Sequence, residues 1–234
     1  MVQENEIMYY YYYDSHPTEK DLIGQPSAHS ECIFFFGKVL RALFRGQCCT
    51  IYQHLNFYHT SDPLEYPLEP DLAVIKGVDP QSVRSWRVGE NGPAPQVVFE
   101  IGSSETWQWD LEEMPALYAR MGVQEYFAYD PHKRLLPKPK IYRRQKGRRL
   151  FGWRLDPASE EMRELPPGPD GSLWSIHLES LLVPDGYYLR LYNNRGQRRL
   201  TREEAEAEQA DAEKRRADAL AEKLRSLGID PDQL

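Results

Sequence analysis

The sequence predicts an α/β domain followed by a long separate helix, and three observations support this prediction. Short apolar runs bounded by turn residues occupy 48–60, 70–77 and 95–103, and such runs are typical of strands. A helical pattern over 110–123 lies between two strand-like runs, and a unit of this size implies a parallel strand pair with a right-handed crossover. From Thr201 to Leu227 the chain contains no aromatic residue, glycine or proline, as expected of one continuous helix.

Composition sets the broad class of the protein. With 234 residues and 41% hydrophobic content, the chain can form one substantial globular domain. The net charge of -7 does not favour a nucleic-acid partner, although a local basic patch still could. The three cysteines include two adjacent ones, which is poor geometry for a disulfide, so we expect a reduced, cytoplasmic protein. The first residues resemble no signal peptide, and no apolar run approaches the ~18 residues of a membrane span.

Two helices are expected before residue 124. Thr18 and Ser27 are both suitable N-caps for the first, and Gly46 ends it. Its buried stripe consists of Cys32, Phe35, Phe36, Val39, Leu40, Leu43 and Phe44. In the second helix, Asp110 has the position of an N-cap and Glu113 follows at capping-box spacing, while Gly122 is the stop. Asp110 could alternatively be a ligand.

The second half of the chain is expected to add strands and the long helix. We predict a strand over 124–131, a hairpin over 133–156, a loop over 157–172 and two short strands over 173–194. The long helix carries a weak heptad-like seam, formed by Ala210, Ala217, Leu220, Leu224 and Leu227. It could be a coiled-coil arm that makes a homodimer, a lid on the domain, or a single solvated helix.

Two acidic residues occupy unusual positions in the strand-like runs. Asp71 stands at the head of one apolar run, and Glu100 lies inside another, 29 residues later. If the two strands pair, both carboxylates can reach the same edge of one sheet. Their oxygens, completed by waters and a phosphate oxygen, suit Mg²⁺ or Mn²⁺, and the ion would offset the cost of burying the charges. The alternative is an ordinary Pro-Asp turn and a solvent-facing glutamate.

Three segments resemble the Uma2 family of predicted endonucleases, within the restriction-endonuclease-like PD-(D/E)XK superfamily. They are "EPDLAVI", "VVFEIGSSET" and "DLEEMPALYARMGVQEYFAYDP", and the resemblance extends over about residues 17–195. It implies a mixed central sheet flanked by helices, a DNA substrate and a divalent metal ion. Asp71 matches the aspartate of the PD motif, and Glu100 matches the second metal-binding acid. We therefore divide the chain into an N-terminal arm (1–16), a restriction-endonuclease-like domain (17–195) and a C-terminal charged helix (196–234).

The sequence departs from the family pattern at the catalytic lysine. The superfamily position two residues after Glu100 is Gly102, and the family's substitute position on the following helix is Met114. A lysine would stabilise charge developing on the phosphate and orient the attacking water. Either another cation replaces it or the chain has lost most of its activity. Lys76 should face the opposite side of its strand from Asp71, and Arg120 a different direction from Met114.

The resemblance suggests two supporting site residues. Ser103 matches a family serine that could hydrogen-bond Glu100 or a metal-bound water, although it could equally be a strand-end cap. Glu31 lies on the first helix, where related nucleases often supply a further acidic metal ligand.

Three other side chains are candidates for the surroundings of the site. Tyr118 resembles a family tyrosine that packs near the acids, although plain core packing would also explain it. The histidines show no zinc-type ligand spacing, but His29 and His54 could approach the site.

A basic run precedes the end of the predicted hairpin. Nine lysines or arginines fall between Lys133 and Arg149. They form either a solvated hairpin or a ridge that contacts DNA phosphates. The residues expected to contact nucleic acid are Lys138, Lys140, Arg143, Arg144 and Lys146. No base-reading helix or zinc module is evident, so sequence-specific recognition is not predicted.

These features leave three functional hypotheses. The first is a Mg²⁺-dependent DNA endonuclease in which a metal-activated water attacks the phosphodiester, impaired by Met114. The second is an inactive protein of the same fold that binds nucleic acid or a protein partner. The third is a scaffold whose working part is the helix over 201–227.

Overall fold

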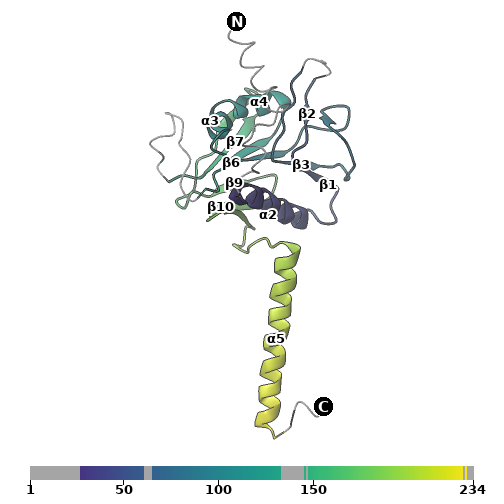
Figure 1. Cartoon of the computed structure of the whole chain (residues 1–234), viewed down its shortest axis with the longest axis vertical. Coiled ribbons are helices and arrows are strands. Elements are labelled where there is room, and N and C mark those ends of the chain that lie inside the picture. The colour runs from purple at the N-terminus through teal and green to yellow at the C-terminus, as the bar shows by residue number, and fades with distance from the viewer. Residues whose placement is uncertain (1–26, 61–64, 133–144, 146, 229, 231–234) are drawn as a thin grey trace.

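A six-stranded mixed sheet forms the centre of the domain in this computed structural model, which describes residues 27–60, 65–132, 145, 147–228 and 230 (Figure 1). In spatial order its strands are β1 (Cys49–Tyr52), β3 (Leu72–Lys76), β5 (Val97–Ile101), β6 (Glu125–Tyr129), β7 (Leu150–Asp156) and β8 (Glu161–Glu164). Strands β5 and β6 pair in parallel, and the other neighbours are antiparallel. The predicted mixed sheet and the predicted parallel pair are both confirmed.

Two smaller sheets accompany the central one. A three-stranded antiparallel sheet has the order β11-β10-β9, and a two-stranded parallel sheet joins β2 to β4. The strands are β2 (Phe57–Tyr58), β4 (Trp86–Arg87), β9 (Leu173–Ser175), β10 (Ser180–Asp185) and β11 (Tyr188–Tyr192).

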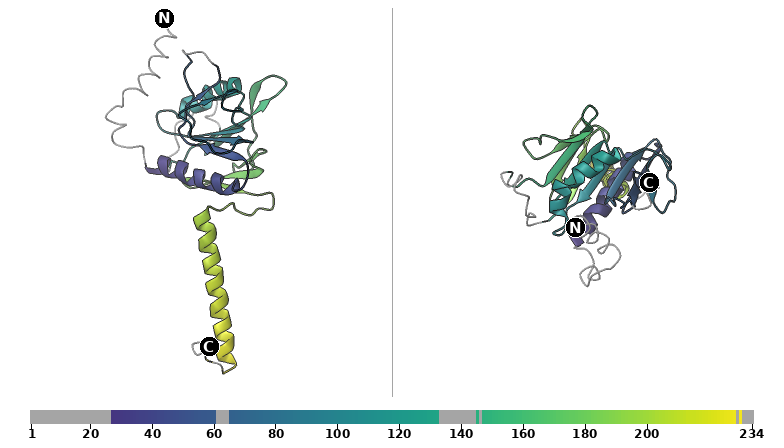
Figure 2. Two further views of the ribbon diagram at one scale, coloured as in Figure 1. Left: turned by 90° about the vertical axis from the view of Figure 1, so that its right-hand side faces the viewer. Right: turned by 90° about the horizontal axis from the view of Figure 1, so that it is seen from above.

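Helices cover both faces of the central sheet. They are α2 (Ser27–Leu43), α3 (Trp107–Glu112) and α4 (Met114–Met121), whereas the C-terminal α5 (Arg202–Ser226) lies apart from the sheet. Figure 2 shows α2 beneath the sheet and the short α3–α4 pair above it. Of the helices that the structure describes, none is long and apolar enough to cross a membrane.

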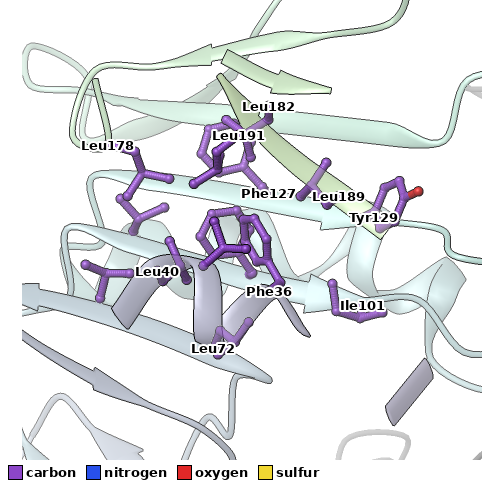
Figure 3. Close-up of a cluster of buried hydrophobic side chains, with 14 of the residues drawn as sticks. Phe36, Leu40, Leu72, Ile101, Phe127, Tyr129, Leu178, Leu182, Leu189 and Leu191 are labelled. Carbon is purple, nitrogen blue, oxygen red and sulfur yellow. The ribbon is translucent and has the colours of Figure 1, made fainter. Parts of the chain in front are cut away.

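The core is divided between the two faces because side chains alternate along a strand. On one face, Val97, Phe99 and Ile101 of β5 pack with α2 and the small β9–β11 sheet, and Figure 3 shows much of this cluster. On the other face, Val98 packs with α3, α4 and the β2–β4 pair. The predicted stripe of α2 is confirmed, with Phe36 and Leu40 completely buried against the sheet.

Helix α5 projects away from the domain as a single long rod (Figure 1). Thr201 caps it through a capping box with Glu204, and no residue of α5 is buried. Its described links to the domain lie at its base and include the ion pairs Lys38–Glu203 (2.9 Å) and Arg190–Glu204 (2.7 Å).

Three local predictions need correction. The region expected as a loop over 157–172 contains β8, which extends the sheet by pairing with β7. The region over 173–194 forms three strands rather than two, because β9 pairs with β10. The single helix expected over 110–123 is two short helices joined at Glu113, and Asp110 lies inside the first of them. The first arm of the predicted hairpin at 133–144 lies outside the described residues.

Candidate active site

Strand register places Asp71 opposite Glu100. In the antiparallel β3–β5 ladder, Leu72 is paired with Phe99. Asp71 immediately precedes Leu72 and Glu100 immediately follows Phe99, so the two acids occupy the next position of the same ladder. Alternation puts both on the face that carries α3 and α4.

Two backbone hydrogen bonds hold the acids together. The Asp71 N–H donates to Oε2 of Glu100 (3.3 Å), and the Ile101 N–H donates to Oδ2 of Asp71 (2.6 Å). Burial raises the pKa of Asp71, and a hydrogen bond between the Asp71 and Glu100 carboxyl groups lowers it by a smaller amount. The structure brings the two side chains together as the sequence predicts, and their role as metal ligands stays a prediction.

Helices α3 and α4 complete the surroundings of the pair. The Tyr118 hydroxyl donates to Oε1 of Glu100 (2.5 Å), so this side chain does more than fill the core. Asp110 is also buried, and its Oδ2 accepts from the Thr106 hydroxyl (3.1 Å). The predicted N-cap role of Asp110 is wrong, because α3 begins at Trp107 and Asp110 lies inside that helix.

Burial raises the pKa of all three carboxyl groups. The pKa of Asp71 is raised to about 7 and that of Asp110 to about 8, in both cases chiefly by desolvation. Desolvation also raises the pKa of Glu100 well above its usual range, and the neighbouring charges of Asp71 and Asp110 add to this effect. No lysine or arginine of the described residues makes an ion pair with any of the three. At neutral pH the cluster therefore favours a bound proton or an added cation.

Two histidines flank Asp71. His54 Nδ1 lies 3.6 Å from Oδ1 of Asp71, and His29 Nε2 lies 3.9 Å from the same oxygen. His29 is 5% exposed, and neither ring nitrogen makes a well-formed hydrogen bond. Burial lowers its pKa to about 4, although the nearby Gly102 carbonyl acts in the opposite direction. The His29 ring is therefore neutral at physiological pH.

Helix α2 brings His29, rather than Glu31, to the acid pair. Two residues along an α-helix correspond to a rotation of about 200°. Accordingly, Glu31 is exposed, whereas His29 is buried beside Asp71. A metal-binding role for Glu31 stays a prediction.

Ser103 organises the turn that opens α3. Its hydroxyl accepts hydrogen bonds from the backbone N–H groups of Glu105 (3.2 Å) and Thr106 (3.1 Å). It also exchanges a hydrogen bond with the Thr106 hydroxyl. This geometry agrees with the capping interpretation, and a catalytic role for Ser103 is left as a proposal.

The superfamily lysine position has no room for a side chain. A Cβ atom added to Gly102 would lie 2.4 Å from Cε3 of the Trp107 indole. Met114 is buried in the first turn of α4, on the same helical face as Tyr118 four residues later.

The two substitute cations considered from the sequence lie elsewhere. Lys76 Nζ donates to the His177 carbonyl (3.0 Å), on the opposite side of the sheet from Asp71. Arg120 is exposed on α4. As expected from strand and helix geometry, neither replaces the missing lysine.

The donor set fits a metal ion that takes few protein ligands. Within the described ranges, no three histidine, cysteine, aspartate or glutamate side chains are arranged to hold a metal together. Mg²⁺ commonly uses only one or two carboxylates, with water and substrate phosphate completing its shell. Asp71 and Glu100 meet that smaller requirement, and their mutual repulsion supplies a reason to bind a cation.

The predicted DNA-contacting residues Lys138, Lys140, Arg143, Arg144 and Lys146 all lie outside the described residues. The last two cations of the basic run are described, and they contact the domain itself. Arg148 pairs with Glu164 (2.6 Å), and Arg149 Nε donates to the Asp130 carbonyl (2.8 Å).

A helical spacing in the sequence could have revealed the neighbours of the acids. Asp110, Met114 and Tyr118 recur every four residues, which places them on one face across the α3–α4 junction. His29 likewise lies on the buried stripe of α2, three residues before Cys32 and seven before Phe36. A polar residue on an otherwise apolar stripe was the available signal.

Comparison with known proteins identifies the family of the chain. The family model of Uma2, described as "Putative restriction endonuclease", matches residues 22–182. A solved structure described as "a putative nuclease belonging to DUF820" from Anabaena variabilis is 16% identical, with 66% of this chain and 75% of that chain covered and a TM-score of 0.44. No curated protein matches the chain. Because the family match extends over more than half of the sequence, the chain belongs to the Uma2 family of restriction-endonuclease-like proteins.

Proposed function

We propose that the protein is a Mg²⁺- or Mn²⁺-dependent DNA endonuclease that hydrolyses phosphodiester bonds at Asp71 and Glu100. The observation that carries this proposal is the buried acid pair at the edge of β3 and β5, with no lysine or arginine of the described residues paired to it. Burying two such charges without compensation would cost several kcal/mol. A divalent cation compensates them and gives the pair a function.

The hydrogen bonds of each acid indicate how it would be held in position to bind the metal ion. Backbone N–H groups fix Oδ2 of Asp71 and Oε2 of Glu100, and Tyr118 fixes Oε1 of Glu100. These bonds hold both carboxylates in place before a metal arrives. When bound, the ion would polarise the phosphodiester and acidify a water.

Three further residues take supporting roles. Asp110, with its pKa raised to about 8, would exchange protons near the pair at neutral pH. Ser103 would shape the loop at the end of β5. Glu31 would act on the metal site through intervening water molecules, because it lies on the exposed side of α2.

Activity should be weak because the catalytic cation is missing at both known positions. Trp107 fills the space beside Gly102, and Met114 cannot donate a hydrogen bond. Loss of one such electrostatic contributor commonly costs on the order of a hundred- to a thousandfold in rate. This observation favours a second candidate, an inactive nuclease-fold protein that binds nucleic acid or a protein partner.

Calorimetry tests the metal site without requiring catalysis. Mn²⁺ titrated into the full chain should give saturable heat, and Asp71→Asn should abolish it because the variant loses one of two carboxylates. Glu161→Gln, which alters an exposed acid on β8, should bind Mn²⁺ like the wild type. Negligible heat for the wild type would overturn the metal-dependent function.

A plasmid-nicking assay separates the two candidate functions. Wild type, Asp71→Asn, Met114→Lys and the double variant Asp71→Asn/Met114→Lys are compared in Mg²⁺ and in Mn²⁺. Nicking by the wild type that Asp71→Asn abolishes supports the endonuclease. Nicking by Met114→Lys alone supports the inactive alternative, and the double variant shows whether the restored activity uses Asp71.

A further inference from the structure

A surface hollow adjoins the acid pair, and one residue both lines this hollow and lies beside Asp71. The hollow has a volume of about 490 Å³, and its lining comprises Ser30, Glu31, Ile33, Phe34, Gln53 and His54. His54 is the shared residue, since its Nδ1 lies 3.6 Å from Asp71 Oδ1. The His54 side chain therefore lies between the hollow and the proposed reaction centre.

Phe34 is the unusual member of this lining. Its side chain is 61% exposed, although Ile33 and Phe36 on the same helix are buried. An aromatic ring exposed beside a hollow offers a face on which a base can stack. The ammonium group of Lys38 lies 4.8 Å from the centre of the ring.

Cations continue from Phe34 along the outer face of α2. Phe34, Lys38 and Arg41 are spaced by four and three residues, so they share one helical face. Arg41 is exposed and donates from its guanidinium to Oε1 of Gln53 (2.8 Å), which itself lines the hollow. An aromatic ring followed by cations is the combination that binds single-stranded nucleic acid, with bases stacked on the ring and phosphates on the cations.

We propose that this hollow is a subsite for an unpaired base of the DNA strand whose phosphate lies at Asp71 and Glu100. The substrate class is then DNA with a single-stranded or frayed segment at the cleavage position. The inference rests on the proposed function and adds the type of DNA to it. Phe34 stacks on the base, and Arg41 attracts the adjoining phosphate, whereas the ammonium group of Lys38 is already paired with Glu203 of α5 (2.9 Å).

The lining explains why a base, rather than a phosphate, occupies the hollow. Ile33 and Phe34 present apolar surface, and Glu31 contributes a carboxylate that repels phosphate. The Glu31 carboxylate and the Gln53 amide instead match the hydrogen-bonding edge of a base. In an intact duplex both faces of an internal base are stacked on its neighbours, so the ring of Phe34 can reach only an unpaired base.

Binding of fluorescent DNA tests the proposal independently of cleavage. The probe is a duplex with a short single-stranded tail that carries 2-aminopurine, compared with a blunt duplex of the same length, in Ca²⁺ with intact DNA verified on a gel. Full-length wild type, Phe34→Ala, Phe34→Trp and Trp174→Ala are measured. Trp174 is a matched control because it is an exposed aromatic residue on β9.

The expected result is preferential binding of the tailed duplex and quenching of 2-aminopurine by the wild type. Phe34→Ala should weaken binding roughly five- to a hundredfold, the range for loss of one base–aromatic stack, and should abolish the quenching. Phe34→Trp should retain both, and Trp174→Ala should behave as the wild type. Because Phe34 is exposed, its variants should melt at the wild-type temperature.

Each contrary result has a separate meaning. Equal binding and quenching by Phe34→Ala and wild type would overturn the subsite while leaving the metal-dependent function intact. Equal affinity for blunt and tailed DNA would overturn the unpaired-base requirement. Failure of every variant to bind DNA would overturn the proposal together with the DNA substrate. A Phe34-dependent signal in a protein that neither binds Mn²⁺ nor cuts would preserve the subsite and reject the endonuclease.

Discussion

The Trp107 indole occupies the space into which a side chain at position 102 would project. A Cβ atom there would lie 2.4 Å from Cε3 of the indole, well inside any normal contact. Trp107 itself is fixed, because it is buried in the core and packs edge-on against Phe151. The packing around position 102, as well as the sequence, therefore excludes the superfamily lysine.

Restoring a side chain at position 102 should destabilise the protein. We expect Gly102→Ala to lower the free energy of unfolding by about 1–3 kcal/mol through overpacking, and Gly102→Lys to lower it further without creating nuclease activity. Urea denaturation measures the change. Trp107→Leu in the Gly102→Ala background should recover part of the loss, and purely additive effects of the two substitutions would contradict the contact.

Removing the Tyr118 hydroxyl should weaken metal binding more than it weakens the fold. Its hydrogen bond lowers the pKa of Glu100, so Tyr118→Phe leaves that acid more strongly protonated at neutral pH. We expect a loss of Mn²⁺ affinity of roughly ten- to a hundredfold at pH 7, measured by calorimetry. Tyr126→Phe is the control, because that hydroxyl donates to the Asp110 backbone carbonyl (2.8 Å). Similar affinity losses in both variants would indicate a general packing effect.

Stability without metal should fall as pH rises from about 6.5 to about 8, because below that range buried His29, with its pKa lowered to about 4, has the opposite effect. The ordinary pKa of an aspartate is 3.8, whereas the folded-state pKa is about 7 for Asp71 and about 8 for Asp110. Between these values the folded chain keeps protons that the unfolded chain has released, and stability then decreases with pH. Thermal melts from pH 5 to 8.5 measure the slope.

Asp71→Asn provides the matching test of that slope. Without metal, the variant should have a higher melting temperature than the wild type at pH 8 and a similar one at pH 5. The reason is that it lacks one carboxyl group whose pKa is raised by burial. Mn²⁺ at pH 8 should stabilise the wild type and leave the variant unchanged. A wild-type melting temperature that stays flat across this pH range would show that burial does not raise these pKa values.

Glu125 should be important for stability and irrelevant to the metal. This buried carboxylate accepts from Arg154, the Ser175 hydroxyl and the Ile176 N–H, and so joins β6 to β7 and the β9 region. Glu125→Ala should cost about 3 kcal/mol in urea denaturation, because buried partners are left unsatisfied. Glu164→Gln, at an acid that is more exposed than Glu125 and pairs with Arg148, should cost less than about 1 kcal/mol. Reduced Mn²⁺ affinity in a folded Glu125→Ala protein would contradict the separation of the two sites.

Truncation after Leu200 should leave the domain folded. No residue of α5 is buried, and its base is tied to the domain by surface ion pairs, so we expect the melting temperature to fall by only about 2–4 °C. Light scattering on the same samples tests the coiled-coil arm. A dimer that becomes a monomer would support it, and an oligomeric state unaltered by truncation would exclude α5 as the dimerisation element.

The sequence predicted that Asp71 and Glu100 would meet if their two strands paired, and the resemblance to the Uma2 family supported this prediction. Strand side chains alternate with a period of two, so pairing of the run headed by Asp71 with the run that contains Glu100 can bring both acids to one edge. The parallel β5–β6 pair followed from the helical segment between them. These are local rules, and they held because each depends on spacing within a few residues or on one short crossover.

Only the tertiary structure decided which other groups surround the acids. The position of Asp110 changed from a cap to a buried neighbour, because packing of Trp107 starts α3 one turn before the sequence signal suggests. The contact of Trp107 with Gly102 depends on how α3 packs, and the helical pattern of α2 marks His29 as buried without showing that its neighbour is Asp71. The physical reason is that alternation and helical period fix the direction of a side chain relative to its own element, whereas the group it meets depends on how the elements pack.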